Sequence, residues 1–296
     1  MSKVAEPHLL ESEPSAPARR KLLAAAALGS VLPGCAGNSA RPAPKATLLA
    51  IVDGVELVRL AAAEPERLLE RKPLVGLDSG DHVVGIDFRV ARGVLYALAA
   101  SGKLYTLDTS SGRLARVGAG TQAIALPGSC FAMDFNPVVD RIRVMSGSGL
   151  NLRLHPDTGA VAGSDPRPAY AAGDDSFGKP PYIAAAAYTY NKRDDKLTTN
   201  YAIDINQGTL VTQGSREGAL PAVSPNSGAL FTVGRLGTGP LDDASLDIAD
   251  TDNTALAALR QLGTTRLYRI DLDSGRAGRL GTLGSGRPVS GLAIEP

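Results

Sequence analysis

The feature that most constrains this chain is an internal repeat with a period of 47 residues. A turn glycine opens the pattern Gly-x-Leu/Ala-x-x-Val/Leu-Gly at Gly112, Gly228 and Gly275, and a fourth copy at Gly159 lacks the closing glycine. These glycines are 47, 69 and 47 residues apart, so the long step is one period plus an insertion of 22 residues in the fourth unit. A repeat of this length predicts a fold assembled from equivalent units.

Each unit has the pattern of four short strands. In the second unit we expect strands over residues 83–88, 94–99, 103–107 and 113–117, lengths that are ordinary for strands. In the turn before the last strand, Asp108 caps the turn and Gly112 takes the left-handed position of a bulged hairpin. Four antiparallel strands at this period are typical of a β-propeller blade.

The two ends of the repeat region complement each other. Residues 289–294 resemble the first strand of a unit, whereas residues 47–52 begin as a second strand. The first blade would therefore combine the C-terminal strand with residues 47–76, which removes a free sheet edge. We predict an all-β fold, a β-propeller of five four-stranded blades in a single domain over residues 46–296. A β-sandwich explains neither the register nor the split first unit.

The N-terminal region, residues 1–35, has the pattern of an export signal. Arg19 and Arg20 precede an apolar run that is too short to span a bilayer permanently. The paired arginines favour twin-arginine translocation over the Sec route, although the phenylalanine and downstream lysine of the fuller motif are missing. The segment ends Leu-Pro-Gly-Cys35, which resembles a bacterial lipobox. An ordinary signal cleaved elsewhere is the alternative.

Lipid on Cys35 would anchor the protein to a membrane, because several acyl chains at about 0.8 kcal/mol per buried methylene bind stably. Residues 36–45 would then be a flexible tether, and the protein would be exported to the cell envelope, at the periplasmic face or outer membrane, or secreted. The other cysteine, Cys130, lies in an apolar stretch and is predicted to be core. The net charge of +1 and the absence of tryptophan give no reason to expect nucleic acid as a partner.

Two stretches, residues 133–146 and 151–159, resemble the core signature of an exported bacterial family catalogued as domain of unknown function 4394. The similarity covers about residues 47–295 and includes residues 85–89 and 224–228. It implies a secreted or anchored propeller-like domain. The family has no established activity, so the resemblance implies no reaction and no ligand, and the lipobox-like cysteine departs from its pattern.

Three aspartates, Asp87, Asp134 and Asp247, occupy equivalent positions on the predicted inner strands, where the other two units have Ala187 and Ala293. Inner strands line the central channel, so these carboxylates could hold a divalent cation such as Ca²⁺, which prefers oxygen ligands. Alternatively, each aspartate ties a neighbouring loop by accepting backbone hydrogen bonds.

A second group of polar residues lies in the third unit: Asn136, Asp140, Arg141, Arg143, Asn151 and Arg153. Arg141 and Arg143 point to the same side of a strand and could bind an anionic ligand. The alternative is a salt-bridge network between blades. The acidic run of the fifth unit, from Asp242 to Asp252, is interpreted as a solvated loop, and residues 192–196 as an exposed hairpin tip.

The leading functional hypothesis is a non-catalytic, envelope-anchored propeller that binds a small molecule, glycan or protein at one mouth of the ring. The second is a metal-dependent hydrolase of the lactonase-like propeller type, in which Asp87, Asp134 and Asn136, Asn151 or Asp247 hold the cation; it rests on fold-level analogy. A scaffold without a small ligand is the third. No catalytic residue can be assigned, since the few histidines lack suggestive neighbours.

Overall fold

The computed structural model describes residues 43–118 and 123–296, which belong to one compact unit that begins at Pro42. The predicted export signal, with Arg19, Arg20 and Cys35, lies outside the described residues. Within the described residues, no helix is both long enough and apolar enough to cross a membrane.

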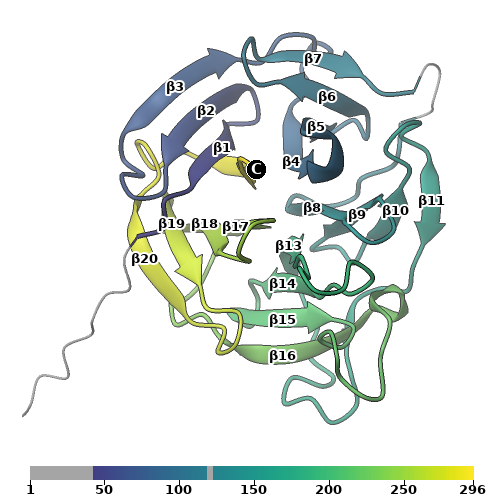
Figure 1. Ribbon diagram of the computed structural model, residues 1–296. Helices are drawn as coiled ribbons and strands as arrows, with labels where there is room; N and C mark the ends of the chain where they lie inside the picture. The colour runs from purple at the N-terminus through teal and green to yellow at the C-terminus, as the bar shows by residue number, and fades with distance from the viewer. Residues whose placement is uncertain (1–42, 119–122) are drawn as a thin grey trace, which may run out of the picture. The chain divides into compact units, whose positions relative to one another are not determined.

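The unit is a five-bladed β-propeller (Figure 1). From the axis outward, the first blade is β21 (Val289–Ile294), β1 (Thr47–Val52), β2 (Glu56–Ala61) and β3 (Leu68–Pro73). The second is β4 (Val83–Arg89), β5 (Val94–Ala99), β6 (Leu104–Asp108) and β7 (Arg113–Arg116). The third is β8 (Phe131–Asn136), β9 (Arg141–Ser146), β10 (Asn151–Leu154) and β11 (Val161–Ser164).

The fourth blade is β13 (Ile183–Tyr188), β14 (Asn200–Asp204), β15 (Thr209–Gln213) and β16 (Ala229–Arg235), with the short β12 (Ala169–Tyr170) outside it. The fifth is β17 (Asp243–Ile248), β18 (Ala255–Gln261), β19 (Thr264–Ile270) and β20 (Ala277–Thr282). Two single-turn 3-10 helices, η1 (Val90–Arg92) and η2 (Pro225–Ser227), lie in connections. The predicted fold class is confirmed.

The hairpin turns have the predicted chemistry. Asp108 Oδ1 accepts a hydrogen bond of 2.8 Å from the backbone N–H of Ser110, and the N–H of Gly112 donates to the Asp108 carbonyl. Gly112 has a φ of 75°, in the left-handed region that glycine adopts without strain. The strands of this second blade begin and end within one residue of their predicted bounds.

The ring closes through the first blade, as the split repeat predicts. β1 pairs antiparallel with β21, with Leu48 opposite Ile294 and Ala50 opposite Leu292. These four side chains are buried in one apolar cluster between the fifth and first blades. The pairing also gives both edges of β1 a hydrogen-bonded neighbour.

Blade packing explains why the inner strands are so apolar. Each blade is covered on both faces by its neighbours, so β4, β13 and β14 are buried along their whole lengths. Cys130 is buried in the cluster between the fourth and fifth blades, which confirms the prediction that it is a core residue.

The insertion in the fourth unit is spread over three connections. Residues 165–182 add β12, which pairs in parallel with β16, and longer connections follow at residues 189–199 and 214–228. Residues 192–196 are exposed in a loop between β13 and β14, so the predicted hairpin tip is confirmed. All three additions lie outside the four main strands, where extra residues do not interrupt the hydrogen-bonded ladders.

The inner strands approach one another closely at two glycines. A Cβ atom on Gly291 would lie 2.9 Å from the backbone nitrogen of Ile86, and one on Gly85 would lie 2.8 Å from Met133 Cβ. The channel beside them narrows to a cavity of about 10 Å³, which is room for about one water molecule. This end of the ring axis is therefore nearly closed.

We predict that Gly291→Ala lowers the free energy of unfolding by about 1–3 kcal/mol, because the added methyl group forces β21 away from β4. Urea denaturation followed by far-ultraviolet circular dichroism measures the change. Gly278→Ala on the outer strand β20 is the matched control, since its Cβ would lie 3.8 Å from the nearest atom. An equal effect of both substitutions would contradict close packing at the axis.

Candidate metal centre and mouth pocket

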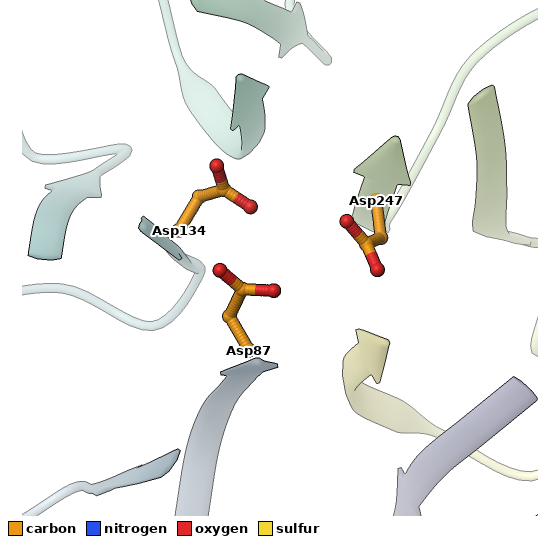
Figure 2. Close-up of side chains that lie close together, drawn as sticks. All are labelled: Asp87, Asp134 and Asp247. Carbon is orange, nitrogen blue, oxygen red and sulfur yellow. The ribbon is translucent and has the colours of Figure 1, made fainter. Parts of the chain in front are cut away.

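Three buried carboxylates meet on the axis of the ring. Asp87 on β4, Asp134 on β8 and Asp247 on β17 stand near the C-terminal ends of inner strands and point toward one another (Figure 2). One oxygen from each lies within 4.8 Å of the other two. The structure thus brings together the three aspartates that the repeat register places in equivalent positions.

Each aspartate also joins its blade to the next one. The backbone N–H of Phe135 donates to Asp87 Oδ2 over 2.6 Å, that of Tyr188 to Asp134 Oδ2 over 2.8 Å, and that of Ile294 to Asp247 Oδ2 over 2.5 Å. Every donor lies on the inner strand of the following blade. The expected tie to a neighbouring loop is in fact a tie to a strand, because the inner strands run side by side around the axis.

Burial makes the ionised form of these groups unfavourable. It raises the pKa of Asp87 and of Asp134 well above the ordinary range, and repulsion between the aspartates raises both further. Burial likewise raises the pKa of Asp247 to about 6. In the described part of the chain, none of the three forms an ion pair with an arginine or lysine. A bound proton or a bound cation would relieve this repulsion.

The donor set fits a calcium ion. Three oxygens within 4.8 Å of one another have a common point that is about 2.8 Å or less from each. Calcium binds oxygen at about 2.3–2.6 Å with six to eight ligands, so shifts of a few tenths of an ångström would complete the contacts. Magnesium, at about 2.0–2.1 Å in strict octahedral geometry, fits less well. Three protein ligands leave further coordination positions for water or a ligand.

A second cavity, of about 480 Å³, lies beside the ends of β4 and β8 from which two of these aspartates project. We call it the mouth pocket; it is lined by residues 89–92, 135–137, Asp140 and Tyr190. Burial raises the pKa of the Tyr190 phenol, and the charges of the three clustered aspartates raise it further, so the phenol and the carboxylates share one environment. The mouth pocket and the carboxylate cluster are therefore neighbours.

Tyr190 is held in place from the fifth blade. Its backbone N–H donates to Asn253 Oδ1 over 2.8 Å, and Asn253 Nδ2 donates to the Tyr190 carbonyl over 3.0 Å. Asn253 itself has a φ of 57°, a conformation that asparagine tolerates better than most residues. Sequence reasoning missed both residues, because they lie in connections of different blades that only the closed ring brings together.

Arg89 forms the other side of the mouth pocket. Its guanidinium is buried and makes a two-pronged ion pair with Asp140, and it also pairs with Asp157 over 2.6 Å. These contacts join the second blade to the third. The alternative predicted for Asp140, an inter-blade salt bridge, is confirmed, with an arginine that the sequence analysis did not single out.

Arg143 lies between the third and fourth blades with a side chain only 1% exposed. It donates to Asn151 Oδ1 and Asp165 Oδ2 in its own blade, and to Tyr188 OH and Asn226 Oδ1 in the next. The guanidinium of Arg143 therefore donates hydrogen bonds to four protein groups in two blades, which matches the predicted network between blades.

The remaining members of this group differ in position. Arg153 pairs with Asp165 over 2.8 Å, and Arg141 donates to the Asp140 carbonyl. Asn136 Oδ1 accepts backbone N–H groups of the following turn, and Asn136 lines the mouth pocket. Only Asn136 and Asp140 of the six therefore reach the pocket. Anion binding by the arginines stays a prediction.

The prediction of a solvated loop for the acidic run of the fifth unit is wrong in part. Asp242 and Asp252 are exposed, but Asp243 and Asp247 lie on β17. The strand forms because these aspartates alternate with the buried Ala244, Leu246 and Ile248, a period of two.

The fold and the carboxylate cluster define the class: a five-bladed propeller with a buried acidic centre on its axis. Residues 56–293 match the family described as domain of unknown function (DUF4394), and the chain belongs to this family. The resemblance seen in the sequence is thereby confirmed. No curated protein sequence matches the chain.

Similar solved structures include a glutaminyl cyclase from Myxococcus xanthus, 14% identical with a TM-score of 0.43, over 73% of this chain and 83% of that one. The dihydro-heme d1 dehydrogenase NirN is 15% identical (TM-score 0.37), over 82% of this chain and 44% of its own. PorZ, a surface component of the type-IX secretion system of Porphyromonas gingivalis, is 18% identical (TM-score 0.39), over 81% and 27%. At these identities and scores the likeness says nothing about activity.

We predict that, in EDTA, the free energy of unfolding falls as the pH rises from about 4 to about 6. The pKa of Asp247 is about 6 in the folded protein against an ordinary 3.8, so the unfolded chain releases this proton first and gains stability relative to the native state. Asp243, also near 6 because of burial, acts in the same direction. Urea denaturation between pH 4 and pH 8 measures the trend; a rise over this interval would contradict it.

We further predict opposite effects for two substitutions of Asp134 at pH 8 in EDTA. Asp134→Asn keeps an acceptor for the Tyr188 N–H and removes a buried charge, so stability is retained or increased. Asp134→Ala leaves that buried N–H without an acceptor and costs about 1–3 kcal/mol. Thermal melting compares both with Asp195→Asn, a control in the exposed segment 192–196. Equal loss in both Asp134 variants would contradict the role of charge.

Proposed function

We propose that this protein is an exported, ligand-binding propeller whose three clustered aspartates hold a calcium ion next to the mouth pocket. The ligand would occupy the mouth pocket, between η1, the start of the β8–β9 connection and Tyr190. The observation that carries this proposal is the convergence of three buried carboxylates, unpaired with any described cationic side chain, beside a cavity of about 480 Å³. That volume is in the range of small-molecule sites.

The lining of the mouth pocket favours binding over catalysis. Its described residues include no histidine, cysteine or serine, so a nucleophile with an adjacent base is not formed there. The lining combines apolar groups, among them Val90, Phe135 and Pro137, with the polar Arg92 and Asn136. A few polar groups in an apolar hollow orient a ligand, which is the usual arrangement of a binding site.

The cellular address is part of the same proposal. The paired Arg19 and Arg20, the short apolar run and the lipobox-like ending at Cys35 support export and a lipid anchor in the cell envelope. A ligand-binding propeller held at a membrane surface would meet its small molecule, glycan or protein partner outside the cytoplasm.

A metal-dependent hydrolase is the second candidate, because the geometry leaves coordination positions open. If the cation is bound by Asp87, Asp134 and Asp247 alone, a substrate carbonyl or a water molecule could complete its shell. A cation in such a position supplies Lewis-acid polarisation of a carbonyl or lowers the pKa of bound water.

We predict that Ca²⁺ raises the melting temperature of the EDTA-treated chain at pH 8. A ligand at 100 times its dissociation constant adds about 2.7 kcal/mol to the free energy of unfolding, which is a clear shift. Asp134→Asn should abolish the shift while the variant remains folded, and the control Asp195→Asn should retain it. Mg²⁺ should give a smaller shift than Ca²⁺. The absence of a shift with any divalent cation would refute the cation site.

The same preparation separates the two candidate functions. Ca²⁺-loaded protein is incubated with lactone and ester substrates, and hydrolysis that disappears in Asp134→Asn would favour the hydrolase. A Ca²⁺-dependent shift without hydrolysis favours the binding module.

A further inference from the structure

The described chain begins at the same end of the ring as the mouth pocket. The inner strands β4 and β8 finish beside that pocket, so we call this end the mouth end. β1 starts there, because the N–H of Glu295, just after β21, donates to the Thr47 carbonyl over 2.9 Å. The preceding Ile294 is the residue whose N–H donates to Asp247 of the carboxylate cluster. Residues 43–46 therefore enter the fold at the mouth end.

The length of chain between Cys35 and Thr47 restricts which end can face a membrane. These residues are 12 positions apart, so the chain between them spans about 40 Å if fully extended and about 20 Å as a random coil. A strand of six residues, such as β1, is about 20 Å long, and connections add to the height of the ring at both ends. A lipid on Cys35 thus favours the mouth end as the end that faces the bilayer, because the opposite end would need a nearly extended chain around the outside of the ring.

Leu220 lies at the mouth end and is 92% exposed. It belongs to residues 214–228, the connection that follows β15. Gln213, the last residue of β15, pairs with Asn200, and Asn200 pairs with Tyr188 at the end of β13. The connection therefore starts where the inner strands finish, which is the mouth end.

Hydrogen bonds hold the loop that carries Leu220. The Ser215 N–H donates to the Val223 carbonyl over 2.9 Å, and the Val223 N–H donates to Ser215 Oγ over 2.9 Å. The Glu217 N–H donates to Thr199 Oγ1 of the neighbouring connection over 2.9 Å. Leu220 is therefore held near the tip of a closed loop.

The surface beside Leu220 is apolar as well. Arg216, a cation beside this loop, already pairs with Asp273 over 3.2 Å. A single exposed leucine is ordinary on a protein surface, whereas a leucine beside an apolar hollow forms a larger patch, which is typical of an interaction site. The hollow here is a cavity of about 480 Å³, and most of its lining residues are apolar: Ala219, Pro221, Val223, Phe231 and Val233.

We propose that the anchored propeller stands with its mouth end toward the bilayer and that Leu220 and its apolar surroundings contact the lipid. This inference rests on the lipid anchor at Cys35, which is part of the proposed function. Residues 192–196 of the neighbouring connection are exposed and carry three cations and two aspartates, so their charges nearly cancel and the contact is apolar. The mouth pocket lies at the same end, so its ligand is met at the membrane surface.

The test places a fluorescent probe at either end of the ring. Leu220→Cys and Leu262→Cys are made in a Cys130→Ala background and labelled with the environment-sensitive fluorophore NBD, and the acylated full chain is reconstituted into phosphatidylcholine vesicles. Leu262 is the matched control, a leucine 95% exposed in the β18–β19 hairpin, at the end of the ring where β17 begins. Apolar groups at a membrane surface lie about 5–10 Å into the lipid boundary, so nitroxide-labelled lipid should quench the probe at position 220 about twofold or more and leave the probe at position 262 unquenched.

Flotation of the unlabelled chain with the vesicles tests the anchor separately. The chain should float and Cys35→Ser should not; a chain that does not float, or a variant that floats equally, overturns the anchor and this inference with it. A floated chain whose probe at position 220 is quenched no more than the probe at position 262 overturns the orientation alone and leaves a protein partner to cover the apolar patch. Melting curves establish that both labelled variants are folded.

Discussion

Closure of the ring is the constraint on which the rest of this structure depends. The antiparallel pairing of β1 with β21 makes the first blade from both ends of the repeat region and brings five inner strands around one axis. Only in a closed ring do positions 47 residues apart face each other. The approach is close enough that Gly85 and Gly291 leave no room for side chains, which nearly closes the axis there.

On the same axis, three buried carboxylates have two roles. Asp87, Asp134 and Asp247 each accept a backbone N–H from the next blade, so they join consecutive inner strands. One oxygen of each also lies within 4.8 Å of the other two in a buried space, where burial raises all three pKa values and repulsion between carboxylates raises those of Asp87 and Asp134 further. A role in joining blades and a role in holding a cation are compatible, because each carboxylate offers about four lone-pair sites, so even Asp247, whose two oxygens accept the N–H groups of Ile248 and Ile294, has acceptor capacity left. Substitution of such an aspartate by asparagine separates the two roles, because the side-chain amide keeps a hydrogen-bond acceptor for the next blade but loses the charge that binds a cation.

The fourth unit breaks the symmetry of the ring, and the mouth pocket depends on it. One added connection carries Tyr190 to the mouth, where Asn253 of the fifth blade holds it. Another, residues 165–182, is held at the opposite end of the blade by Asp204, which accepts hydrogen bonds from the Tyr170 hydroxyl and the Tyr182 N–H. The four regular strands keep their ladders, and the chemistry that distinguishes this unit lies in the connections.

Four features follow from the sequence: the period of 47 residues, the strand bounds, the split first blade and the equivalence of the three aspartates. Each depends on local turn chemistry and on a register that repeats along the chain. The partners of the polar groups do not follow from it. Arg89 with Asp140, Arg143 with Asn226, and Tyr190 with Asn253 lie in different blades, and no local pattern encodes which side chains meet across a blade interface. The sequence by itself determined the ring and the radial position of its carboxylates; the tertiary structure decided which polar groups are paired and which face a cavity, because these depend on the angles at which neighbouring blades pack.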